Sequence, residues 1–74
     1  MKHFLLVYDR HRGVLVNEEV FDKGDEALDR RFQLERDLQN EKDIEVVVLS
    51  ASSRAALLVT HGRYFRTLGQ LANG

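Results

Sequence analysis

Apolar and polar residues in the first part of the chain predict two strands joined as a hairpin. Residues 2–8, KHFLLVY, are apolar on both faces of an extended chain, which is typical of a central strand. A polar connection, residues 9–13, ends in glycine, and residues 14–21 are again rich in β-forming side chains. Because an asparagine and two glutamates at residues 17–19 are costly in the centre of a sheet, we expect the second strand at an edge.

A helical period follows the hairpin. Asp22 is a candidate N-cap, and residues 23–39 are predicted to form a long amphipathic helix. Its apolar side chains fall on one broad arc, made of Ala27, Leu28, Phe32, Leu34 and Leu38. Glu26 and Arg30 are four residues apart, so we expect them to pair on the helix surface.

The last part of the chain predicts a third strand and a second, shorter helix. Residues 43–49, DIEVVVL, are rich in β-branched residues on both faces. The serines within residues 50–53 offer capping hydroxyls for a helix over residues 54–60, which Gly62 is expected to close. Residues 67–74, TLGQLANG, lack periodicity, and we expect a flexible tail there.

These elements predict one small α+β domain over residues 1–66 with the order ββαβα, followed by the tail at residues 67–74. We expect a three-stranded mixed sheet of strand order 2-1-3, a long helix packed on one face and a short C-terminal helix. The alternative order, 1-2-3, would place the acidic strand in the middle. In the order 2-1-3 the long helix covers one face, so the second apolar face needs a cover from the short helix and tail or from a second subunit.

Composition narrows the possible stabilising devices. The chain has 74 residues and no cysteine, which excludes disulfides and thiolate zinc sites as substitutes for a large core. The apolar run near the N-terminus is too short for a signal peptide or a membrane span. We therefore expect a cytoplasmic protein without a membrane partner.

The formal net charge of −1 is unevenly distributed along the chain. Residues 14–50 hold eleven acidic and five basic residues, whereas residues 51–74 hold three arginines and no acid. The order 2-1-3 would bring the basic hairpin loop and the basic C-terminal segment to the same end of the sheet. This predicts a candidate contact surface for phosphate or nucleic acid made of Arg10, His11, Arg12, His61, Arg63, Tyr64 and Arg66. The alternative is that these arginines are solvated and that Tyr64 or Phe65 packs onto the sheet.

Signatures of catalysis and of metal binding do not emerge from the sequence. His3, His11 and His61 lack the spacing of a metal site, and Asp25 and Asp29 share a helix face that is predicted to be solvated. The sequence contains no glycine-rich phosphate loop or dinucleotide fingerprint. We therefore predict no catalytic residue, no cofactor and no metal, and a protein that is not an enzyme.

The third strand offers a surface for association. Ile44, Val46, Val47 and Val48 form an apolar run with little charge to deter pairing by another strand. The leading prediction is a non-enzymatic protein-interaction or regulatory module that associates with itself, as a homodimer, or with a protein partner through an apolar sheet face or an edge strand. The alternative is a small nucleic-acid-binding accessory protein that uses the basic surface.

Three stretches of the chain, "HFLLVYDR", "IEVVVL" and "THGRYF", together with the acidic amphipathic segment between them, carry a resemblance over roughly residues 3–65. The chain resembles a family of small uncharacterised proteins from actinobacteria and their phages. The resemblance implies an intracellular setting in a bacterium or phage, and it implies no activity and no functional residue.

Overall fold

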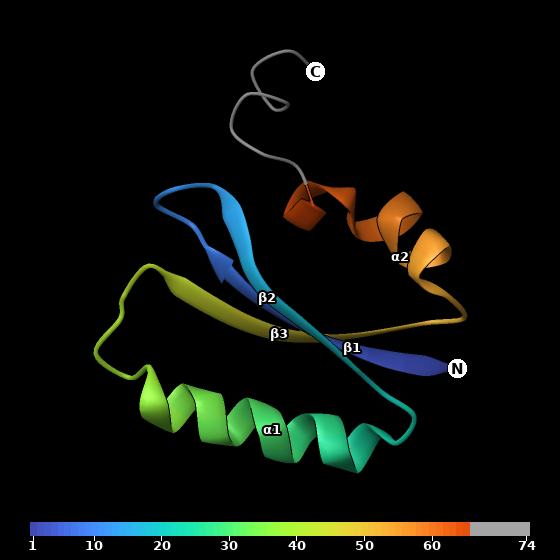
Figure 1. The fold of residues 1–74 in the computed structure, drawn as a ribbon, viewed down its shortest axis with the longest axis horizontal. Coiled ribbons are helices and arrows are strands. Elements are labelled where there is room, and N and C mark those ends of the chain that lie inside the picture. Colours follow the sequence, from blue (N-terminus) through green and yellow to red (C-terminus); the bar gives the residue numbers. More distant parts are fainter. Residues whose placement is uncertain (66–74) are drawn as a thin grey trace.

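A three-stranded sheet lies between two helical layers in the computed structural model, which describes residues 1–65 apart from the side chains of residues 63 and 65 (Figure 1). The strands are β1 (Lys2–Asp9), β2 (Val14–Phe21) and β3 (Ile44–Ala51), the helices are α1 (Gly24–Asp37) and α2 (Arg54–His61), and a short 3-10 helix, η1 (Gly62–Phe65), follows α2. The expected tail at residues 67–74 and the predicted site residue Arg66 lie outside the described residues.

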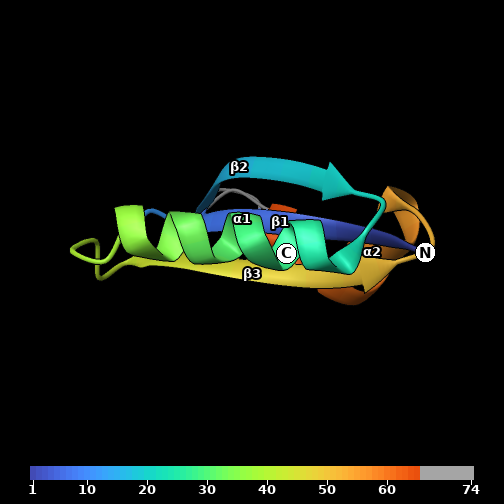
Figure 2. The same ribbon diagram turned by 90° about the horizontal axis from the view of Figure 1, so that it is seen from below.

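The strand order is β2-β1-β3, as the sequence predicts, and both ladders are antiparallel. The prediction of a mixed sheet is therefore wrong. The crossover through α1 makes β3 run in the same direction as β2, but β1 lies between these two strands and runs opposite to both (Figure 2). No parallel pair of neighbours is formed in the described sheet as a result.

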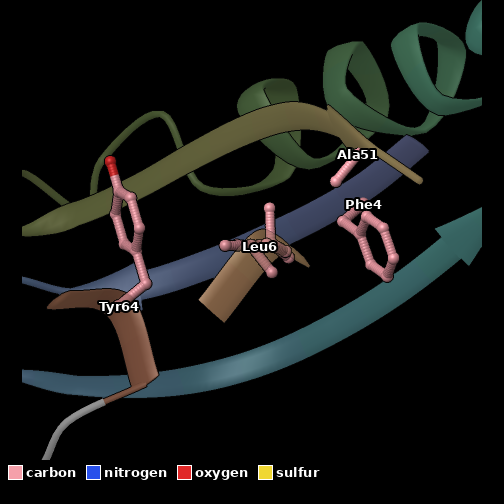
Figure 3. Packing of buried hydrophobic residues seen from close by; sticks show 5 residues of the cluster. Phe4, Leu6, Ala51 and Tyr64 are labelled. Atoms are coloured by element: carbon pink, nitrogen blue, oxygen red, sulfur yellow. The ribbon is translucent and has the colours of Figure 1, made fainter. Parts of the chain in front are cut away.

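One face of the sheet is covered by α2 and η1. Phe4 and Leu6 of β1 form a buried cluster with Ala51, Leu57 and Tyr64 (Figure 3). We expected this face to need a cover, and residues of the same chain provide it. The short helix supplies Leu57 and the 3-10 helix supplies Tyr64. A second subunit is not required to bury this face.

The opposite face is covered by α1. Leu5 alternates with Phe4 and Leu6 and lies fully buried on this side, as does Ala27 of the helix. A Cβ at Gly24 would lie 3.4 Å from the ring of His3, which shows how closely the start of α1 approaches β1. Both faces of the central strand are thereby buried, which explains its continuous apolar run.

Helix α1 begins differently from the prediction. Lys23 occupies the N-cap position without a side-chain cap, and the predicted cap, Asp22, instead lies 3.3 Å from the Nζ of Lys2. The expected pair of Glu26 with Arg30 is replaced by a contact between Arg30 and Glu19 of β2 at 3.1 Å. A charged partner on the sheet has thus displaced a weaker pairing along the helix surface.

Helix α2 begins as predicted and ends differently. The amide of Ala56 donates to the Ser53 hydroxyl at 3.1 Å, which confirms the serine cap. Gly62 does not close the helix in a left-handed conformation, because its φ of −59° and ψ of −24° are helical and the chain continues into η1. That extra turn carries Tyr64 onto the sheet.

Gly13 closes the hairpin loop with a φ of 69°, and its amide donates to the carbonyl of Asp9 at 2.8 Å. A Cβ disfavours this left-handed conformation, so we expect Gly13→Ala to lower the free energy of unfolding by about 1–2 kcal/mol. Gly13→Asn should cost less, because asparagine enters this region more readily. Urea denaturation of the three proteins measures the difference. Equal stability of Gly13→Ala and the unsubstituted chain would contradict the left-handed conformation of residue 13.

Candidate interaction surface

The two glutamates of the β2 edge are each held by an arginine from a different helix. Glu18 and Glu19 lie opposite Leu6 and Leu5 of β1, so they point to opposite faces of the sheet. Arg54 of α2 donates to both carboxylate oxygens of Glu18, at 2.8 and 3.2 Å. Arg30 of α1 donates to Glu19 on the other face, at 3.1 and 3.2 Å. Each helical layer is therefore joined to β2 by an arginine.

The contact with Glu18 also changes the acidity of Arg54. The hydrogen bond to the carboxylate, and then its negative charge, raise the pKa of the guanidinium group above its ordinary value.

The register of β2 is irregular between Val7 and Tyr8 of β1, where Val16 is the extra residue. Charged side chains and a bulge are both features that deter pairing at an edge strand.

The other edge is formed by β3, and among the described residues no strand pairs with its outer side. The amide of Arg10 donates to the carbonyl of Asp43 at 2.8 Å, in register with the ladder between β1 and β3. Backbone groups alternate in direction along an antiparallel pair. The N–H and C=O groups of Val46, Val48 and Ser50 are therefore directed away from β1, along the outer side of the sheet.

The side chains of the predicted association surface are divided between the two faces. Val48 lies opposite Leu5 of β1, so Val48 and Val46 are on the face that α1 covers. Val47 lies on the other face and packs against the buried cluster under α2. Ile44 and the three valines are all half-buried. These four residues therefore do not form an uncovered apolar face. The part of β3 that is open to a partner is its backbone edge.

Helix α1 carries an exposed apolar pair, Leu28 and Phe32. Ala27 points into the core and Arg30 reaches β2, so successive residues at about 100° place Leu28 and Phe32 on the side of α1 that faces away from β2. We name Leu28 and Phe32 the β3 shoulder, since β3 is the opposite edge. Their residues are 43% and 56% exposed, although the sequence places both on the predicted core arc.

The basic hairpin loop is tied to the connection before β3. The guanidinium of Arg10 donates to the carbonyl of Lys42 at 2.7 Å, and the amide of Arg12 donates to the Asp9 carboxylate at 3.1 Å. Arg10, His11 and Arg12 are exposed. The described contacts explain the loop's shape, and a role in phosphate binding stays a prediction.

Tyr64 belongs to the core. Its residue is 5% exposed, its ring packs edge-on against Tyr8 with centroids 5.3 Å apart, and its hydroxyl donates to Glu45 at 2.8 Å. A ring held in this way is not available to stack on a base in this conformation, so Tyr64 is corrected from a binding residue to a packing residue. The alternative prediction, in which one of the two adjacent aromatics folds onto the sheet, describes Tyr64.

The remaining residues of the basic surface are not brought together by any described contact. His61 is half-buried at the end of α2, while the side chain of Arg63 and all of Arg66 lie outside the described residues. Tyr64 does reach Tyr8, the residue two positions before Arg10, so η1 lies at the expected end of the sheet.

A polar pair that joins two strands was among the contacts that sequence reasoning missed. His3 Nδ1 and Ser50 Oγ lie 2.8 Å apart and join β1 to β3. These residues are direct partners in the ladder between β1 and β3. Knowledge of the register between residues 2–9 and 44–51 would therefore have predicted the pair. Within the described residues there is no group of three or more metal-ligating side chains, and no cavity is found.

Comparison of the chain with protein-family models, with curated proteins and with solved structures found no match. In the part of the chain that the structure describes, neither helix has the length and apolar character needed to cross a membrane.

Proposed function

We propose that the chain is a non-enzymatic protein-interaction module that binds its partner by strand addition at the edge of β3. The observation that carries this proposal is the difference between the two edges of the sheet. The β2 edge has a bulge and two glutamates, each held by an arginine. The β3 edge is a regular eight-residue strand without these features.

Backbone chemistry supports this choice of edge. A regular edge strand presents a row of donors and acceptors that another strand can satisfy, and natural proteins commonly block such edges with charge, proline or bulges. The sequence of β3, IEVVVLSA, contains no lysine, arginine or proline. Its one charged side chain, Glu45, accepts the hydrogen bond from Tyr64 on the α2 side. Little in the strand opposes an added strand.

Strand addition predicts that a proline at an outward-directed amide abolishes partner binding. Val48→Pro removes a donor on the outer side of β3 and leaves the donors that face β1 in place. Val48→Ala is the control, because it also replaces the valine side chain but keeps the backbone N–H group. The chain and both variants each carry one affinity tag and are expressed together with a second copy of the same protein that carries a different tag. Every protein that is recovered with the first tag in stoichiometric amount is then quantified.

We expect the unsubstituted chain and Val48→Ala to retain a bound protein, either the second copy or another protein, and Val48→Pro to lose it by about tenfold or more. Circular dichroism must show that Val48→Pro is folded. Equal recovery by the proline and alanine variants would show that the edge is not the binding element.

A further inference from the structure

The edge strand and the β3 shoulder together identify an occupant. We propose that a second copy of this chain binds at the edge, with the two β3 strands antiparallel and the two α1 helices side by side through Leu28 and Phe32. This inference rests on the proposed function, since it names the partner that the β3 edge receives.

Symmetry makes the antiparallel arrangement natural. A two-fold axis perpendicular to the sheet relates a strand to an antiparallel copy of itself, and two-fold dimers are the commonest assemblies of identical chains. Every neighbouring pair in the sheet is already antiparallel. With the axis at Val47, the outward-directed Val46 of one copy lies opposite Val48 of the other, and both can exchange backbone hydrogen bonds.

The same axis determines where the helices lie. It keeps both copies of α1 on the same face of the extended sheet, on either side of the new strand pair. The β3 shoulder of each copy then faces the other across the axis. Leu28 and Phe32 are four residues apart on one helix face, so they form a short apolar strip that its counterpart can cover. Burial of this strip would remove two of the larger exposed apolar side chains from water.

Charge along α1 favours the antiparallel pairing of the helices as well. Residues 24–29 carry three acidic side chains and no basic one, whereas residues 30–37 carry three arginines and two acids. One of these arginines, Arg30, is held by Glu19 on the β2 side, so Arg31 and Arg36 are the ones left to face a second helix. In the two-fold arrangement the acidic start of one helix lies beside the more basic end of the other, and the helix dipoles oppose each other. Parallel helices would place the acidic segments together. A strand of a different protein could also pair with β3. That protein would need apolar and charged side chains of its own that match those of α1.

The test is the assembly state of the purified chain, measured by sedimentation velocity over a range of concentrations. We expect a dimer whose dissociation constant rises by about tenfold or more in Phe32→Glu, because the apolar contact is lost and two carboxylates approach the axis. Val59→Glu is the matched control, since Val59 is an 84% exposed apolar residue on α2, and this change should leave the dimer intact. A dimer that survives Phe32→Glu would overturn the arrangement of the helices.

Hydrogen exchange of the unsubstituted chain provides a second measurement that needs no variant. The amides of Val46 and Val48 should become more protected as the chain concentration rises. Protection that is independent of concentration in a monomer would indicate an occupant from the same chain and overturn the inference.

Two further outcomes separate the inference from the proposed function. A monomer at every concentration that still retains a different protein, lost in Val48→Pro and kept in Val48→Ala, would overturn the second copy as occupant and leave strand addition standing. A dimer that is unchanged in Val48→Pro would overturn both.

Discussion

Leu57→Ala should lower the free energy of unfolding by about 2–5 kcal/mol, as truncations of fully buried leucines do. Leu57 is the fully buried residue of α2 and lies in the cluster with Phe4 and Leu6. A domain of this size has a total stability of only about 3–5 kcal/mol from its core. The variant should therefore be partly or wholly unfolded at room temperature, which circular dichroism with a urea titration would measure.

Leu58→Ala is the control for this experiment because it makes the same chemical change one residue further along the same helix. Leu58 is 37% exposed, so its truncation should cost far less than that of Leu57. Similar losses for the two variants would contradict the position of α2 on the sheet. A comparison of the pair thus separates the burial of one helix face from the helix propensity of the segment.

Tyr64→Ala should be the second strongly destabilising change, at about 3–5 kcal/mol, the range found for buried aromatic residues. The ring packs edge-on against Tyr8 of β1 within the buried cluster, and its loss would leave a cavity at the hairpin end of the core. Thermal unfolding followed by circular dichroism measures this effect. A folded Tyr64→Ala with unchanged stability would return Tyr64 to the role of an exposed binding residue.

Tyr64→Phe distinguishes packing from the hydrogen bond. It keeps the edge-on contact with Tyr8 and removes the hydroxyl that donates to Glu45. Because this bond is partly exposed to solvent, its removal should cost about 1 kcal/mol, well below the cost of losing the ring. A loss as large as that of Tyr64→Ala would assign the stabilisation to the hydroxyl group.

The sheet was accessible from sequence because its strands differ in polarity. The continuous apolar run of residues 2–8 required cover on both faces, and the glutamates at residues 18 and 19 required an edge, so the order 2-1-3 followed. The edge position of β3 followed from the same order. The distribution of apolar and charged residues was sufficient for the strand order. It was not sufficient for the strand directions of neighbours, since the predicted mixed sheet is antiparallel throughout the described strands.

The candidate surface was only partly accessible. A helical period shows that Leu28 and Phe32 share a broad arc with Ala27, but it does not show where the sheet ends beneath the helix. Likewise, two consecutive aromatics in a sequence do not show that the ring of Tyr64 turns inward. Those facts depend on where α1 and α2 lie over three strands, which is a matter of tertiary packing.

The position of Tyr64 also bears on when the protein can fold during its synthesis. Phe4, Leu6 and Tyr8 belong to the first strand, whereas the residues that cover them, Leu57 and Tyr64, are made some fifty residues later. One apolar side of the growing hairpin therefore stays bare until nearly all of the described chain has left the ribosome. Completion of the core is a late event that joins the two ends of the described chain, and nascent chains are most exposed to wrong partners before it occurs.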